Sequence, residues 1–183
     1  ALPVGAELGL AISNIAPEDA SFSSNTAMLR VMRDARVDWS DPSLANLSSP
    51  TGGQRMSGEQ LERFNAAFEY DFSHVVLHTD SQAAQASQAL YAHAFALGSH
   101  IWFGPGEYRP GSVATDRLLS HELTHVLQSD RGRIAANGSG VSSPSDPLEQ
   151  EAYGNEDRMV SRLKQVDQAR AKGVDVSEGL EAG

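Results

Sequence analysis

The chain has 183 residues, of which 40% are hydrophobic, which suffices for the core of one domain. Its formal net charge of −10 argues against nucleic acid or an anionic membrane as the main partner. The absence of cysteine excludes disulfides, thiolate metal sites and cysteine nucleophiles. No apolar run approaches the roughly 20 residues of a membrane span. Because the chain begins without methionine, we expect a processed chain that has lost any signal peptide.

The first third of the chain shows little regular patterning. Residues 1–25 mix small, polar and apolar residues, and residues 25–36 place apolar side chains at helical spacing. A stretch rich in serine, proline and glycine follows. We therefore expect an N-terminal arm and linker over residues 1–55, a domain over residues 56–172 and a flexible tail over residues 173–183.

The expected domain begins with a helix and a short strand. Ser57 and Gln60 have the spacing of a capping box and predict a helix through about Tyr70. Residues 74–78, "HVVLH", predict a strand because three β-favouring residues stand in a row. Its two histidines would lie about 13 Å apart on one face, too far to share an ion. We expect structural roles for them, as for the isolated His93 and His100.

A second helix and a second strand follow. Thr79 and Gln82 again have capping-box spacing. They predict a helix over the alanine- and glutamine-rich residues 81–94. Residues 100–104, "HIWFG", predict another strand, which ends at a glycine- and proline-rich turn.

Residues 118–128, "LLSHELTHVLQ", contain the motif His-Glu-x-x-His at His121, Glu122 and His125. On an α-helix, histidines four residues apart lie about 40° apart on one face. Both can therefore bind one metal ion at about 2.0–2.1 Å. Glu122 neighbours that face and can accept a proton from a metal-bound water. The spacing predicts a catalytic zinc site, with a solvated helix carrying two surface histidines as the alternative.

The remainder of this helix fits the same arrangement. Thr115 is the expected N-cap, with Asp116 in the first turn. The side opposite His121 is apolar and is expected to face the core. Its residues are Leu119, Leu123, Val126 and Leu127. The histidines are then expected to face a cleft, which Leu118 also lines.

A catalytic zinc ion needs a third protein ligand, and no histidine follows His125. The candidates are carboxylates on a last helix, whose start is predicted by Asp146 as N-cap and the proline after it. Our choice is Glu149, for which capping of the helix N-terminus is the competing role. Glu151 and then Glu156 are the alternative ligands.

The segment "EQEAY" resembles the Glu-x-x-Ala-Asp signature on the third-ligand helix of several Glu-type zinc peptidases. Glu149 and Ala152 match this signature, whereas Tyr153 stands where aspartate is expected. That aspartate normally hydrogen-bonds a zinc ligand, so the substitution changes the support of the site. We expect Tyr153 to be an ordinary helix-surface aromatic, with a phenolic hydrogen bond to the site as the alternative.

From Asp71 to Gln128 the chain resembles the zincin-like eCIS core domain, which is found beside extracellular contractile injection systems. The resemblance is carried by "DFS", "HTD", "AFALG", "IWFGPGEY" and "LLSHELTHVLQ", in order and spacing, and by "DPLEQEA" downstream. It implies an α+β, zincin-like fold that is mostly helical with a small β-sheet, and it implies zinc ligation and peptidase activity. In such a fold, residues 101–103 are either an edge strand that pairs with extended substrate or a buried core strand.

Motif and resemblance together predict a zinc-dependent metalloendopeptidase with Glu122 as general base and His121, His125 and Glu149 as metal ligands. Its expected partners are a polypeptide substrate and components of the injection system, and its expected location is secreted or delivered by that system. It would release an effector or process itself. One alternative is a catalytically weak or inactive zincin-like module that docks cargo. Another is a zymogen in which residues 1–55 cover the cleft.

Overall fold

The computed structural model describes residues 11–14, 40–45, 47, 49–133 and 146–176. The expected helix over residues 25–36 lies outside these ranges. The described elements are β1 (Ala11–Asn14), the 3₁₀ helix η1 (Pro42–Leu44), α2 (Gly58–Phe68), β2 (Val76–His78), α3 (Ser81–Ala89), β3 (Ala92–Leu97), β4 (His100–Phe103), α4 (Val113–Asp130) and α5 (Pro147–Ala171). The expectation of an α+β fold with a small sheet is confirmed. None of the described helices is both long and apolar enough to cross a membrane.

The sheet has the strand order β1-β3-β4-β2. β3 pairs antiparallel with β1 and with β4, whereas β4 pairs parallel with β2. Both sides of β4 are therefore hydrogen-bonded to neighbouring strands. Its residues Ile101, Trp102 and Phe103 are at most 5% exposed. Residues 101–103 thus form a buried core strand, and the alternative of a substrate-pairing edge strand is wrong.

The expected helix over residues 81–94 is correct only in its first part. α3 ends at Ala89, and Tyr91 adopts a left-handed φ of 54° that stops the helical path. Residues 92–97 then form β3, which turns back into β4 at Gly98, where φ is +57°. The alanines here have high helix propensity, but pairing with two strands outweighs that local preference.

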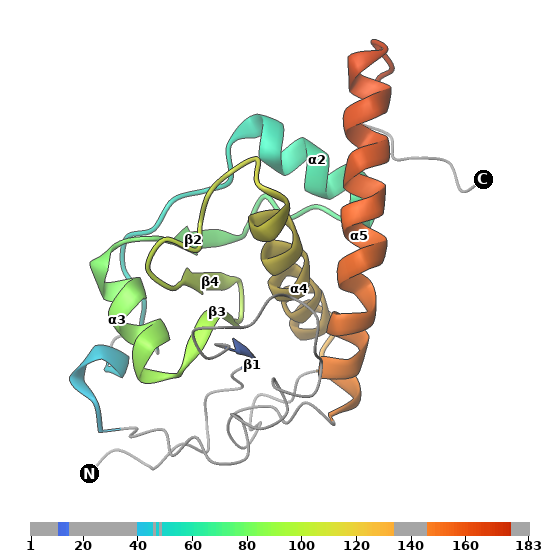
Figure 1. The fold of residues 1–183 in the computed structure, drawn as a ribbon. Coiled ribbons are helices and arrows are strands. Elements are labelled where there is room, and N and C mark those ends of the chain that lie inside the picture. Colours follow the sequence, from blue (N-terminus) through green and yellow to red (C-terminus); the bar gives the residue numbers. More distant parts are fainter. Residues whose placement is uncertain (1–10, 15–39, 46, 48, 134–145, 177–183) are drawn as a thin grey trace, which may run out of the picture.

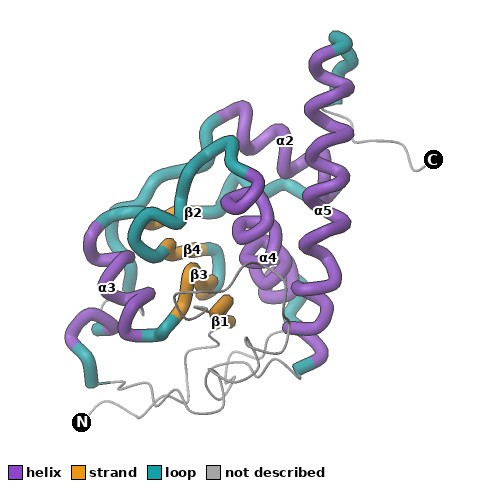
Figure 2. Tube along the Cα trace, in the orientation of Figure 1, coloured by secondary structure: helices purple, strands orange, loops and turns teal. Residues whose placement is uncertain are grey.

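Helices cover both faces of the sheet (Figures 1 and 2). One face packs on α2, α4 and α5 through a core that includes Leu77, Ala94, Ala96, Ile101, Phe103, Phe64, Leu119, Leu123 and Leu163. The other face packs under α3 and η1 through Phe95, Trp102, Ala83, Leu90, Leu44 and Leu47. Part of the expected linker, around η1, therefore contributes to the core. Val176, in the expected tail, is also buried, at 6% exposure.

Two of the expected helix starts are confirmed. The Ser57 hydroxyl accepts a hydrogen bond from the backbone N–H of Gln60, so Ser57 is the N-cap of α2. The Gln60 side chain accepts from Tyr108, and in this way it ties α2 to the loop before α4. Asp146 caps α5 by accepting from the N–H of Leu148, and a proline occupies the first turn.

The other two starts are displaced from their predicted positions. Asp80, not Thr79, caps α3 by accepting from the N–H of Ala83. Ser112, not Thr115, caps α4, because its hydroxyl accepts from the N–H of Thr115. The hydroxyl of Thr115 instead donates to the carbonyl of Glu107 and holds the preceding loop. Several residues in each stretch have capping side chains, and the loop geometry decides which of them caps the helix.

Candidate metal centre

The His-Glu-x-x-His motif lies on α4, which runs between the sheet and the long helix α5 (Figure 1). Glu149, in the first turn of α5, is brought to the two histidines of the motif. The Nε2 atoms of His121 and His125 are 3.1 Å apart. Glu149 Oε2 lies 3.4 Å from Nε2 of His121, and its Oε1 lies 3.3 Å from Nε2 of His125. Three potential ligand atoms from two helices thus surround one point.

The spacing of these atoms fits a metal ion. Ligands about 2.0–2.1 Å from a tetrahedral ion lie roughly 3.3–3.4 Å from one another. The three separations here, 3.1, 3.3 and 3.4 Å, are close to that value. Among the described residues, neither buried carboxylate oxygen of Glu149 has a hydrogen-bond partner. Because an uncompensated buried carboxylate is costly, the geometry and the chemistry both suit a bound cation.

The outer nitrogens of both rings have partners that fix the tautomers. His121 Nδ1 lies 2.9 Å from the Glu156 carboxylate, which accepts its hydrogen. His125 Nδ1 lies 2.9 Å from Oε1 of Gln128. The Gln128 amide is oriented by its Nε2, which donates to the carbonyl of Leu148, so its oxygen accepts from His125. Each Nε2 is therefore the ring nitrogen left to bind a metal ion or a proton at the shared point.

The carboxylates make this point strongly negative. Burial lowers the pKa of His121, but Glu149 and Glu156 outweigh burial and raise this pKa to about 10. Burial raises the pKa of Glu149, but the two histidines outweigh it and lower this pKa to about 2. The two shifts reflect the mutual attraction of the His121 ring and the Glu149 carboxylate, so a cation, either a proton or a metal ion, is favoured between them.

The expected cleft in front of the histidines is absent from the described structure. His121, Glu122 and Glu149 are 0% exposed, and His125 is 2% exposed. The histidine face of α4 packs on α5, whose Glu149 and Glu156 contact the two rings. Leu118 packs against the core and does not line a cleft. The periodicity of α4 correctly places Leu119, Leu123 and Val126 in the core, but the prediction is wrong for Leu127, which is only partly buried and belongs to neither core cluster. Periodicity carries no information about what covers each face.

Tyr153 lies at the site, so the expectation of an ordinary surface aromatic is wrong. Its ring centroid is 4.7 Å from that of His121, with the rings inclined by 56°. Its hydroxyl is buried and has no hydrogen-bond partner among the described residues. Burial raises the pKa of Tyr153, and the charges of Glu149, Glu156 and Glu122 raise it further. The phenol therefore stays protonated beside the histidines, as a donor.

Glu151 and Glu156, the alternative ligands, have other partners. Glu156 accepts a hydrogen bond from the outer nitrogen, Nδ1, of His121. Glu151 accepts from Gln128 and forms an ion pair with Arg133 at 2.7 Å. Neither the role of Glu156 nor that of Gln128 was predicted. The only sequence feature that could have indicated these roles is helical spacing, which places Glu156 on the same face as Glu149 and Gln128 on the same face as His125.

The remaining histidines pair away from this centre. His78 and His100 share a hydrogen bond of 2.8 Å across β2 and β4. His74 bonds Asp130, and His93 bonds Glu107. Structural roles for all four agree with these contacts.

Comparison with known families identifies part of the chain. Residues 55–133 match the family model described as the eCIS core domain. The match spans α2 through α4 and includes His121, Glu122 and His125, and it ends before Glu149. No curated protein and no solved structure matches the chain.

Proposed function

Because residues 55–133 match the eCIS core domain, we propose that this chain is a zinc-dependent endopeptidase that acts with an extracellular contractile injection system. The observation that carries the proposal is the convergence of two histidine lone pairs and the Glu149 carboxylate on one point. Two imidazoles and a carboxylate on a His-Glu-x-x-His helix are a ligand set typical of catalytic zinc in a zincin-like fold. A polypeptide is the proposed substrate, and secretion or delivery by the injection system is the proposed location.

The proposed roles follow from the positions of the side chains. His121, His125 and Glu149 bind the metal, and Glu156 and Gln128 orient the two rings. When bound, a zinc ion would act as a Lewis acid and would lower the pKa of a water at the site to about 7. Glu122, next to His121 on α4, accepts a proton at its carboxylate and returns it to the leaving amine. The hydroxyl of Tyr153 is the proposed hydrogen-bond donor to a substrate bound at this site.

The test is a comparison of Glu122→Gln with the native chain. We expect about one zinc ion per chain in both proteins. Cleavage of a denatured protein should fall at least about 100-fold in the variant, because the general base is lost. Glu59→Gln is the matched control, since it makes the same change at an exposed residue of α2, away from the ligand group, and should retain cleavage. Native-level cleavage by Glu122→Gln would contradict the assignment of Glu122.

The second candidate is a zinc-stabilised docking module without peptidase activity. It is favoured by one observation, the near-complete burial of His121, Glu122, His125 and Glu149. Structural zinc sites are closed, whereas catalytic sites keep an open position for water. Bound zinc together with no cleavage of any denatured substrate would support this module over the enzyme.

A covered, inactive enzyme is the third form of the proposal. Strand β1, from the N-terminal arm, pairs antiparallel with β3 and contacts α4. An extended substrate adds to the edge of a sheet in the same way. Removal of residues 1–39 leaves Leu44 and Leu47 in the core and should expose this edge. Cleavage that appears only after this removal would identify the arm as inhibitory.

A further inference from the structure

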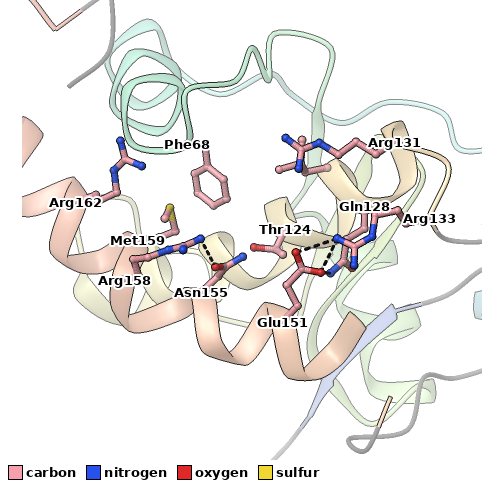
Figure 3. Close-up of a pocket in the computed structure, with 11 residues that line it drawn as sticks. Phe68, Thr124, Gln128, Arg131, Arg133, Glu151, Asn155, Arg158, Met159 and Arg162 are labelled. Carbon is pink, nitrogen blue, oxygen red and sulfur yellow. Dashed lines mark hydrogen bonds and ion pairs between the residues drawn. The ribbon is translucent and has the colours of Figure 1, made fainter. Parts of the chain in front are cut away.

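A hollow of about 150 Å³ opens beside the metal centre, between α2, α4 and α5 (Figure 3). Part of its lining is apolar, namely Phe68, Leu127 and Met159, the last of which is 2% exposed. Four arginines surround this apolar part: Arg131, Arg133, Arg158 and Arg162. The hollow therefore combines a nonpolar floor with a cationic rim.

Two of the four guanidinium groups are already paired with carboxylates. Arg133 forms an ion pair with Glu151 at 2.7 Å, and Arg162 forms one with Glu69. These two arginines are largely neutralised by their partners.

The other two guanidinium groups remain available to a ligand. Arg158 donates to the uncharged Oδ1 of Asn155, and within the described residues Arg131 forms no ion pair. Both residues are exposed. Four of the chain's 14 basic residues thus gather at one hollow of a chain whose net charge is −10. Arg131 and Arg158, which have no ion pair among the described residues, favour an anionic ligand.

We propose that this arginine hollow binds an acidic polypeptide segment, with one carboxylate between Arg131 and Arg158. The planar guanidinium group matches a carboxylate in two parallel hydrogen bonds. The methylene groups of a glutamate side chain, or an adjoining apolar residue, would pack on Phe68 and Met159, which a bare inorganic anion cannot do. The volume suits one side chain. The binding site requires no metal and goes beyond the proposed peptidase activity.

The hollow is also linked to the metal centre. Gln128 lines it and at the same time accepts the hydrogen of His125 Nδ1. A peptide bound here would contact Gln128, which in turn contacts the candidate metal ligand His125.

The test uses the full chain carrying Glu122→Gln, so that cleavage cannot consume the probe. The probe is a fluorescein-labelled peptide of alternating glutamate and leucine, and its reference has glutamine in place of glutamate. In fluorescence anisotropy at about 150 mM salt, long-range charge effects are screened. We expect the acidic peptide to bind at least about tenfold more tightly than the reference, since charge-assisted hydrogen bonds exceed neutral ones.

Matched variants separate the hollow from net charge. Arg131→Gln with Arg158→Gln should weaken binding at least about tenfold. Lys164→Gln with Lys172→Gln makes the same charge change outside the hollow, on α5 and at its C-cap, and should weaken binding less than about twofold. Arg131→Lys with Arg158→Lys keeps the charge but loses the planar fork, and an intermediate loss is expected. Circular dichroism checks that each variant is folded.

Three results would overturn the proposal. One is an equal loss of peptide affinity in the arginine and the lysine double variants, which would show that binding depends on overall charge. Another is equal affinity for the acidic and the glutamine peptides. The third is binding of inorganic phosphate without binding of the acidic peptide, which would make the hollow a small-anion site. None of these results bears on the Glu122 test, because that test measures cleavage.

Discussion

Glu156 on α5 accepts a hydrogen bond from Nδ1 of His121 on α4 at 2.9 Å, across 35 positions of sequence. This contact directs Nε2 of His121 toward His125 and Glu149. Glu156 is itself held by Arg117, which lies 3.4 Å away and also pairs with Asp157. The orientation of this candidate metal ligand therefore depends on a carboxylate that is not itself in the ligand group.

Replacement of Glu156 tests this dependence. Glu156→Ala should weaken zinc binding by about 10–100-fold, because His121 loses the partner that fixes its tautomer and orientation. Competition with a chelating zinc indicator measures the affinity. Asp157→Ala is the control, since Asp157 also pairs with Arg117 but its side chain is 84% exposed and lies outside the centre. If both variants lost zinc affinity equally, the loss would be caused by the change at Arg117 and not by the hydrogen bond from His121 to Glu156.

The histidine pair in the sheet predicts a pH dependence of stability. Burial lowers the pKa of His78 and of His100, and the charge of the neighbouring His100 or Arg55 lowers each further. The unfolded chain therefore binds protons near pH 6.5 that the folded chain does not bind. The contribution of this pair to the free energy of unfolding should therefore fall as the pH decreases through about 6.5. In metal-free protein the raised pKa of His121 acts in the opposite direction, so the contribution of the pair is the difference between the native chain and a variant that lacks it. Urea denaturation of metal-free protein at about pH 7.5 and about pH 5.5 measures this change.

The control for this prediction removes the titrating pair. His78→Phe preserves stacking on Trp102, whose ring centroid is 4.8 Å from that of His78. Combined with His100→Gln, it should reduce the loss of stability on acidification. An unchanged loss in the double variant would show that other groups cause it.

Two leucines on α4 test which side of the helix faces the core. Leu123 is 0% exposed and lies in the main core, whereas Leu127 is partly exposed and lines the arginine hollow. Leu123→Ala should lower the free energy of unfolding by about 2–5 kcal/mol, because it leaves a cavity. Leu127→Ala should cost no more than about 1 kcal/mol. Comparable losses in urea denaturation would contradict this orientation of α4.

Arg63 joins three helices, and its replacement should lower the free energy of unfolding. From α2 it contacts the Asp116 carboxylate of α4 at 3.0 and 3.2 Å and the Asp167 carboxylate of α5 at 2.6 and 2.8 Å. Arg63→Met leaves Asp116, with a side chain only 10% exposed, without this partner. The expected loss of unfolding free energy is about 2–3 kcal/mol in thermal or urea denaturation.

Two further variants define the origin of that loss. Adding Asp116→Asn to Arg63→Met should restore part of the stability, because it removes the buried charge. Arg170→Met removes a pairing with Glu62, whose side chain is 62% exposed, and should cost at most about 1 kcal/mol. Equal losses from Arg63→Met and Arg170→Met would show that burial of the Arg63 contacts has no effect.

The sequence by itself determined the features that depend on neighbours along the chain. Helical periodicity places His121 and His125 on one face of α4 and Leu119 and Leu123 on the other. The aspartate and proline at positions 146 and 147 determine where α5 begins, and thereby put Glu149 in its first turn. These signals are local, since each acts within one or two helical turns.

Only the tertiary structure decided the features that need distant segments to meet. β3 replaces the end of a predicted helix because strands on both sides satisfy its backbone hydrogen bonds. Packing of α5 on α4 buries the histidines, brings Glu156 and Gln128 to their outer nitrogens and gathers the arginines at one hollow. A helical pattern specifies which residues share a face. It does not specify which distant helix covers that face, because the packing of the whole core selects that partner.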